Sequence, residues 1–289
     1  LIRPNYSLII YVMKENALLK LDHLSTLEIN GKGSFDLLQG QITADINKVS
    51  DNNCVIGAMC DIKGRVISSF IVVKNFKQDD GYILIGNIDS LEILNDALSK
   101  FVPFYKTELI LSDQITIIAI KESCLLKDFP ETDLSKTSQN QDNFQRVHYL
   151  DKDFHLLIAD EISAFGAYEI DENQNLWELD EIRHNNFEIS STTSGIFTAH
   201  ELGYDKTKRI DFEKGCYTGQ EVVARMQYRA KTLPKLLSLK SKNIYEVMSK
   251  IYNDQRKQIG IVLSSAQSED TNHYLLSMNK NYQNQDFEF

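Results

Sequence analysis

The pattern of apolar and polar positions predicts strands over much of the first half of the chain. Residues 64–74 are rich in β-branched and aromatic side chains, which favour a strand, and the turn Asp61-Ile62-Lys63-Gly64 joins this run to a second strand over 54–60. Three further apolar runs predict strands at 18–29, 82–85 and 115–120.

Two helices are predicted in the same half. Apolar residues recur at 91, 94, 98 and 101 behind Asp89, a good N-cap, so a helix is expected there, and Pro103 limits its end. A shorter helix is predicted over 35–39, capped by Ser34 and stopped by Gly40.

The second half mixes polar connections with short regular elements. The polar stretch 127–145 predicts a loop, and the Ser/Thr-rich stretch 189–200 predicts a connection. Between and beyond them, the sequence predicts a hairpin of 146–150 with 154–159, a helix over 176–183, and strands at 236–239, 259–263 and 274–278. Helices and strands are intermixed without a regular βαβ alternation, which indicates an α+β fold.

Composition narrows the class of protein. The chain has 289 residues, 42% of them hydrophobic and 25% charged, enough for two or three packed units with a sizeable core. No apolar run approaches the ~20 residues that span a membrane, and no secretory signal is expected at the N-terminus. The four cysteines form no C-x-x-C pair, so neither a self-contained metal site nor a disulfide framework is predicted, and a cytoplasmic location is expected.

Charge is distributed unevenly. The net charge of −10 argues against direct, sequence-independent nucleic-acid binding. Residues 206–235, however, hold eight basic residues against three acidic ones. The basic residues of this island are Lys206, Lys208, Arg209, Lys214, Arg225, Arg229, Lys231 and Lys235. Such an island predicts a specific anionic ligand, and the alternative is a solvated charged face.

The densest group of special residues is the signature segment, residues 214–225, KGCYTGQEVVAR. Thr218 and Glu221 have the spacing of a capping box, which predicts a helix from Gly219. Cys216 then lies just before a helix N-terminus and two residues from Lys214, and both features favour a thiolate. Such a loop can hold an anion or present a reactive sulfur. The alternative is that Cys216 is a small buried hydrophobe.

The signature segment resembles that of the YgfZ family of folate-binding proteins, which are relatives of the glycine-cleavage T-protein, an aminomethyltransferase. Three other stretches agree in order: LLQGQITAD at 37–45, CDIKGR at 60–65 and DEIR at 180–183. The resemblance spans roughly residues 20–265 and departs from the family at Asn185-Asn186-Phe187 and at Thr198-Ala199.

The resemblance implies a T-protein-like architecture of three parts around a central folate channel. A discontinuous folate-binding domain, 1–48 and 112–230, would carry the KGCYTGQE motif. An inserted α+β domain would occupy 49–111, and a small β-barrel domain would occupy 231–289.

The resemblance also implies a function. A tetrahydrofolate-binding accessory protein would support assembly or repair of iron–sulfur clusters, with iron–sulfur proteins as clients, and thereby enzymes that methylthiolate tRNA. The alternative is aminomethyl transfer, but Ser68 and Ser69 stand where T-proteins carry an acidic pair, and serine cannot supply the carboxylate. A third hypothesis is an unrelated thiol enzyme that pairs Cys216 with a base, for which His200 is the nearest histidine in sequence.

Site residues follow from the chemistry of a folate, which has a flat ring and an anionic tail. Arg225, Arg229 and Lys231 are the expected partners of the tail. Tyr217 and Tyr228 are candidates for lining the ring slot. Lys214 and Arg183 are further candidates for binding the ligand, Cys216 is the expected functional thiol, and no metal ligand is predicted.

Overall fold

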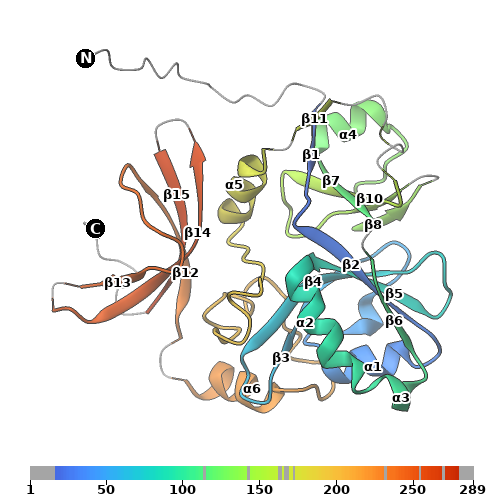
Figure 1. Cartoon of the computed structure of the whole chain (residues 1–289), viewed down its shortest axis with the longest axis horizontal. Helices are drawn as coiled ribbons and strands as arrows, with labels where there is room; N and C mark the ends of the chain where they lie inside the picture. The colour runs from blue at the N-terminus through green and yellow to red at the C-terminus, as the bar shows by residue number, and fades with distance from the viewer. Residues whose placement is uncertain are drawn as a thin grey trace.

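The computed structural model describes residues 17–279 apart from 113–114, 142–143, 162–164, 166–168, 172, 231–232, 254 and 269–270. Three β-sheets with helices beside them make up this part of the chain (Figure 1). The α+β expectation is therefore confirmed. None of the helices in the described part is long and apolar enough to span a membrane.

The five-stranded sheet has the order β3-β4-β5-β2-β6 and is antiparallel throughout. Its strands are β2 (Leu24–Asn30), β3 (Val55–Cys60), β4 (Val66–Lys74), β5 (Gly81–Asn87) and β6 (Glu108–Leu111). The predicted hairpin is confirmed by the antiparallel pairing of β3 with β4, and both strands bury nearly every side chain.

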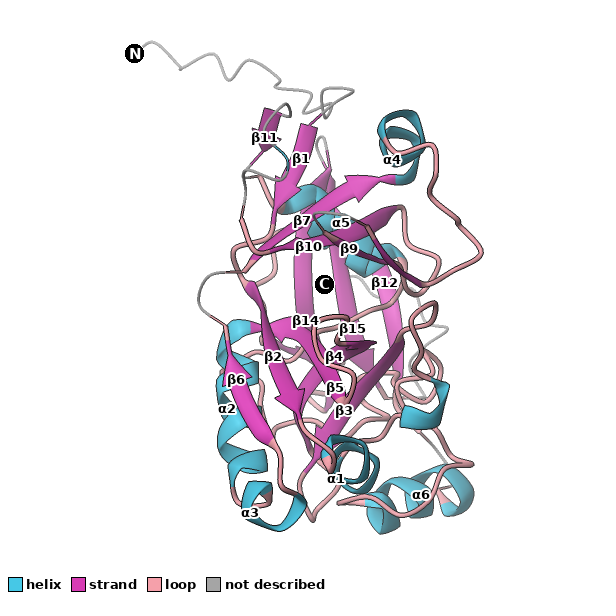
Figure 2. Ribbon diagram, turned by 90° about the vertical axis from the view of Figure 1, so that its right-hand side faces the viewer, coloured by secondary structure: helices cyan, strands magenta, loops and turns pink. Residues whose placement is uncertain are grey.

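Helices α1 (Ser34–Gln41), α2 (Ile88–Ser99) and α3 (Val102–Tyr105), with the 3₁₀ turn η1 (Ile46–Lys48), accompany this sheet (Figure 2). The predicted apolar stripe of α2 is confirmed: Leu91, Leu94 and Leu98 are fully buried in one core with β2, β4 and β5. Pro103 does not simply end that helix, because it stands in the first turn of α3, where its missing N–H costs nothing.

The six-stranded sheet has the order β11-β1-β7-β10-β9-β8. Its strands are β1 (Ala17–Lys20), β7 (Thr116–Lys121), β8 (Ser138–Asn140), β9 (Gln145–Val147), β10 (Phe154–Ala159) and β11 (Glu169–Asp171). The stretch 18–29 was expected to form one strand and instead forms two, β1 and β2, in different sheets. The stretch 127–145, predicted as a loop, contains β8 and the last residues of α4 (Glu122–Asp128).

The C-terminal strands form an open antiparallel sheet of order β12-β15-β14-β13. They are β12 (Lys235–Ser241), β13 (Lys250–Tyr252), β14 (Gln258–Ser268) and β15 (Thr271–Met278). A β-rich C-terminal unit is confirmed, but its described strands do not close into the barrel that the resemblance implied. Helix α5 (Asn175–Arg183) packs against β14 and β15.

Strand pairing crosses one of the predicted domain limits. The five-stranded sheet takes β2 from the range 1–48 and its other four strands from 49–111, because β2 pairs with both β5 and β6. A further core joins the five-stranded sheet, α5, α6 (Gln220–Arg229) and the C-terminal sheet. Its members include Ala58, Cys60, Leu179, Tyr204, Val223, Leu263 and Leu275.

Candidate functional site around residues 214–225

Lys214 anchors the start of the signature segment inside the protein. Its ammonium donates to the backbone carbonyl oxygens of Gln39 at 2.8 Å, Ile42 at 2.7 Å and Ala44 at 2.8 Å. Burial lowers the pKa of Lys214 to about 8, although nearby carboxylates act in the opposite direction. All three ammonium protons are used by the protein, so Lys214 ties the stretch 37–45 to the signature segment and has no donor left for a ligand.

Thr218 also connects these two stretches, and the predicted capping box is wrong. Its hydroxyl donates to Oε1 of Gln41 at 2.9 Å instead of capping a helix. Helix α6 begins at Gln220, one residue later than expected, and its N-cap residue Gly219 makes no side-chain cap. The partner of Thr218 lies 177 residues earlier in the chain, so local spacing could not show it.

The turn between β3 and β4 lies directly against the start of α6. A Cβ on Gly219 would lie 2.4 Å from the carbonyl oxygen of Asp61, and a Cβ on Gly64 would lie 2.8 Å from the Cβ of Val222. Both glycines also have positive φ, 83° and 72°. Any side chain at either position would push the turn and the helix apart, so these glycines permit the contact.

Cys216 is exposed on the loop between Lys214 and α6. Its neighbours Lys214 and Tyr217 are buried, so both sides of the loop are fixed while the thiol faces solvent. Cys54 and Cys60 differ, because burial raises their pKa values to about 11 and about 12. Cys54 and Cys60 are therefore packing residues of the interior. Cys216 is exposed, so it does not have that role.

The outer face of α6 presents three of the candidate ligand residues together. Arg225, Tyr228 and Arg229 are all exposed, Tyr228 to 72%. They line an open groove of about 510 Å³, and the Tyr228 ring is steadied by an edge contact with Phe212 at 6.2 Å between centroids. Glu221, Val222 and Ala224 complete the described lining. Two guanidinium groups one helical turn apart can bind an anion, and the aromatic ring between them can contact a flat group.

The remaining candidates lie elsewhere or are enclosed. Tyr217 is buried in the core, with the Lys214 ammonium 5.4 Å from its ring centre, and burial raises its pKa. Arg183 ends α5 and lies 3.8 Å from a carboxylate oxygen of Asp153. Helices α5 and α6 lie in opposite halves of the molecule in both views (Figures 1 and 2), and Arg183 is not among the described residues that line the groove. Lys231 is outside the described residues.

The basic island is partly internal, which sequence counting could not show. Arg209 is fully buried, and its guanidinium donates to the carbonyl oxygens of Gly57 and Phe70, both at 3.2 Å. It also contacts Asn186 at 3.0 Å and forms an ion pair with Glu188. Arg209 and Lys214 therefore stabilise the interior and add little positive charge to the surface.

Sequence reasoning missed a polar cluster around Glu188, whose side chain is 18% exposed and whose partners Ser69 and Arg209 are fully buried. The hydroxyl of Ser69 donates to Glu188 at 2.6 Å and accepts from the N–H of Ile189 at 2.8 Å. Ser68 accepts a hydrogen bond from Ser90 at 2.8 Å. The serines that stand in place of an acidic pair are thus fully buried and engaged. No sequence signal marks Glu188, because Ser69 and Arg209 come from distant segments.

His200 does not serve as a base for Cys216 in this arrangement. It is 1% exposed, and its Nε2 lies 3.0 Å from Oε1 of Gln227 on α6. In the part of the chain that the structure describes, no hydrogen bond joins His200 to Cys216, and no group of three or more His, Cys, Asp or Glu residues is placed to hold a metal ion.

Comparisons with known proteins agree with the resemblance. The chain is 28% identical over 277 residues to "tRNA-modifying protein YgfZ" of Colwellia psychrerythraea (strain 34H), a match that covers 89% of this chain and 83% of the relative. The chain resembles the YgfZ proteins along most of its length. The YgfZ protein of Klebsiella pneumoniae (strain 342) is 26% identical over 272 residues, covering 88% and 82%. No family model matches the chain.

The solved structures confirm the expected fold. Glycine cleavage system aminomethyltransferase T from Bartonella henselae aligns with a TM-score of 0.71 over 92% of this chain and 79% of that one. Sequence identity in this alignment is 11%, so it shows that this YgfZ-like chain has the T-protein fold and does not extend to activity.

Proposed function

We propose that this protein is a tetrahydrofolate-binding accessory factor that supports the assembly or repair of iron–sulfur clusters, and thereby the enzymes that methylthiolate tRNA. The observation that carries the proposal is the exposed Cys216 on a loop whose flanking residues are buried. The name of the YgfZ relatives supports the link to tRNA modification. The protein would act in the cytoplasm on iron–sulfur proteins and would not bind nucleic acid directly.

The folate part of the proposal rests on the outer face of α6. Arg225 and Arg229 supply paired cations for an anionic tail, and Tyr228 supplies an aromatic face. Lys231 follows α6 in the sequence and remains a candidate partner for the tail. Lys214 and Tyr217 are buried in the interior, so the proposal assigns the folate contacts to Arg225, Tyr228 and Arg229.

Calorimetry with tetrahydrofolate tests this part. We expect saturable binding that weakens with added salt, since the attraction is between exposed charges. Replacing Arg225 and Arg229 together by Ala removes two charged donors and should weaken binding about tenfold or more. The matched control is Arg256→Ala, at an exposed arginine of the C-terminal unit. No binding at millimolar ligand, or equal binding by the double variant, contradicts the folate site.

The thiol part is tested separately in cells. A strain lacking the gene is complemented with Cys216→Ala or with the control Cys124→Ala, and methylthiolated tRNA nucleosides are measured by mass spectrometry. We expect Cys216→Ala to give the level of the deletion strain while its stability changes by no more than ~1 kcal/mol, because an exposed thiol contributes little packing. Normal methylthiolation with Cys216→Ala at equal protein abundance would show that the thiol is dispensable.

A further inference from the structure

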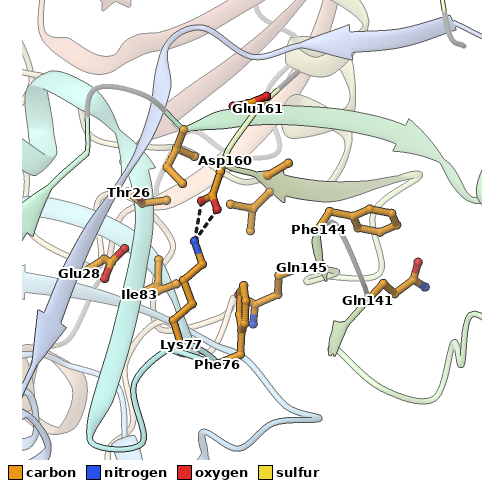
Figure 3. A pocket seen from close by; sticks show the side chains of 13 residues that line it. Thr26, Glu28, Phe76, Lys77, Ile83, Gln141, Phe144, Gln145, Asp160 and Glu161 are labelled. Carbon is orange, nitrogen blue, oxygen red and sulfur yellow. Dashed lines mark hydrogen bonds and ion pairs between the residues drawn. The ribbon is translucent and has the colours of Figure 1, made fainter. Parts of the chain in front are cut away.

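One apolar side chain stands far out of the surface close to the signature segment. Ile62 is 82% exposed at the tip of the β3–β4 turn and belongs to none of the core clusters formed by the described residues. Phe76 is a contrast: it is 47% exposed, but the Lys77 ammonium, which binds Asp160, lies 5.6 Å from its ring centre (Figure 3). Single exposed apolar residues are common, so the surroundings of Ile62 decide whether it has a role.

The β3–β4 turn holds Ile62 in one position. Oδ1 of Asp61 accepts the backbone N–H groups of Lys63 at 2.8 Å and of Arg65 at 2.9 Å, which fixes the turn from within. The turn also lies directly against the start of α6, which fixes it from outside (Figure 1). A side chain presented by a rigid turn loses little freedom on binding, as do the residues that anchor protein interfaces.

Exposed neighbours of Ile62 form a continuous surface with it. The Arg65 guanidinium donates to the carbonyl oxygen of Ile196, a second exposed isoleucine at 42%. Lys63 and Arg65 are both exposed, and neither forms an ion pair with a described residue. The carboxylate of the turn, that of Asp61, belongs to a half-buried residue and accepts the two backbone N–H groups. The turn surface, Ile62, Lys63, Arg65 and Ile196, is therefore apolar and positively charged.

This chemistry favours a protein partner with an apolar pocket and an acidic rim. A fixed isoleucine fits a preformed apolar pocket, and the two cations beside it favour carboxylates around that pocket. The turn surface also lies close to the functional thiol. Cys216 precedes Gly219 by three residues, at most ~11 Å of extended chain, and Gly219 lies against Asp61 of the turn. A protein bound to the turn surface would therefore lie within reach of the thiol.

We propose that the turn surface is the docking site for the iron–sulfur protein that Cys216 serves. Ile62 would occupy an apolar pocket of that protein, and Lys63 and Arg65 would pair with carboxylates at the rim of the pocket. The identity of the partner rests on the proposed function, whereas the place of docking and the complementary chemistry come from the turn itself.

A purified tRNA methylthiotransferase that holds its iron–sulfur clusters is the probe, and its binding to the full chain is measured by biolayer interferometry. We expect Ile62→Ser to weaken binding about tenfold or more, because it removes the anchor. Ile244→Ser is the matched control, at an isoleucine of the C-terminal unit that is 86% exposed, and should change nothing. Lys63→Glu should weaken binding and reduce its salt dependence, whereas Lys242→Glu, at another exposed lysine, should do neither.

Ile62 and Lys63 are exposed, so their variants should melt at the temperature of the unmodified chain, and a loss of binding would be local. The docking site is overturned if the unmodified chain does not bind the probe, or if Ile62→Ser and Ile244→Ser bind it equally. Self-association of the unmodified chain that Ile62→Ser abolishes would assign the turn surface to a second copy and would also overturn it.

Complementation with Cys216→Ala separates the docking site from the proposed function. If methylthiolation requires Cys216 while Ile62→Ser binds the probe normally, the proposed function stands and the docking site is wrong. If Ile62→Ser loses binding while Cys216→Ala complements fully, the docking site stands and the role of the thiol is wrong.

Discussion

At the scale of single residues, burial decides roles that sequence could only suggest. Lys214 and Arg225 look alike in the printed sequence, as two cations of one basic segment. The structure places the Lys214 ammonium among three carbonyl oxygens and leaves Arg225 exposed. Cys60 and Cys216 differ in the same way, because Cys60 is buried and Cys216 is exposed. Sequence reasoning could pick out the segment, but it could not tell which of its side chains lie in the interior and which lie on the surface.

Lys214→Met should destabilise the protein without touching the exposed face of α6. The substitution keeps the length of the side chain but leaves the carbonyl oxygens of Gln39, Ile42 and Ala44 without their shared donor. We expect a loss of about 2–4 kcal/mol in the free energy of unfolding, measured by urea denaturation. Lys206→Met, at an exposed lysine of the same island, should change it by less than ~0.5 kcal/mol. Equal stability of the two variants would contradict the anchoring role.

At the scale of elements, three stretches that the sequence picked out separately prove to be one structural unit. The loop after α1 holds Lys214, and the β3–β4 turn packs on Gly219 at the start of α6. Regular elements with strong periodicity, such as α2 and the β3–β4 hairpin, were predictable because their own residues determine them. The start of α6 was not, because Thr218 bonds to Gln41 and not to its own helix.

The two glycines of the signature segment should therefore differ in their effect on stability. Gly219→Ala places a Cβ 2.4 Å from Asp61 O at a φ of 83° and should cost about 2 kcal/mol or more. Gly215→Ala meets nothing within 4 Å and should change stability by less than ~0.5 kcal/mol. Thermal unfolding of both variants measures this. A tolerated Gly219→Ala would mean that the turn and α6 can separate freely.

At the scale of the whole molecule, the resemblance supplied the T-protein fold, which periodicity could not have given. Individual strands were predictable, but their pairing was not: β1 and β2 are neighbours in sequence and belong to different sheets. We propose a division into three parts around a central folate channel. The inserted part would begin at β2 and not at residue 49, because β2 pairs with β5 and β6. The Glu188 cluster was beyond sequence reasoning, since Ser69, Glu188 and Arg209 meet only after folding.

The last prediction follows from that cluster: the protein should not catalyse aminomethyl transfer despite its T-protein fold. Ser68 and Ser69 are fully buried, and each hydroxyl is engaged by a protein group. The carboxylate beside Ser69, that of Glu188, already has a protein partner on each oxygen, the Arg209 guanidinium on one and the Ser69 hydroxyl on the other.

Incubation with an aminomethylated carrier protein and tetrahydrofolate should therefore yield no methylenetetrahydrofolate above background, while a T-protein assayed in parallel turns the same substrate over. The double variant Ser68→Ala with Ser69→Ala distinguishes trace contamination from a genuine activity of these hydroxyls. Product formation by the unmodified chain that disappears in the double variant would show that the serines perform the chemistry, and it would restore the transferase as the leading function. Product that persists at one level in both proteins would be independent of the serines, and it would contradict the prediction if its amount follows this chain through a further purification step.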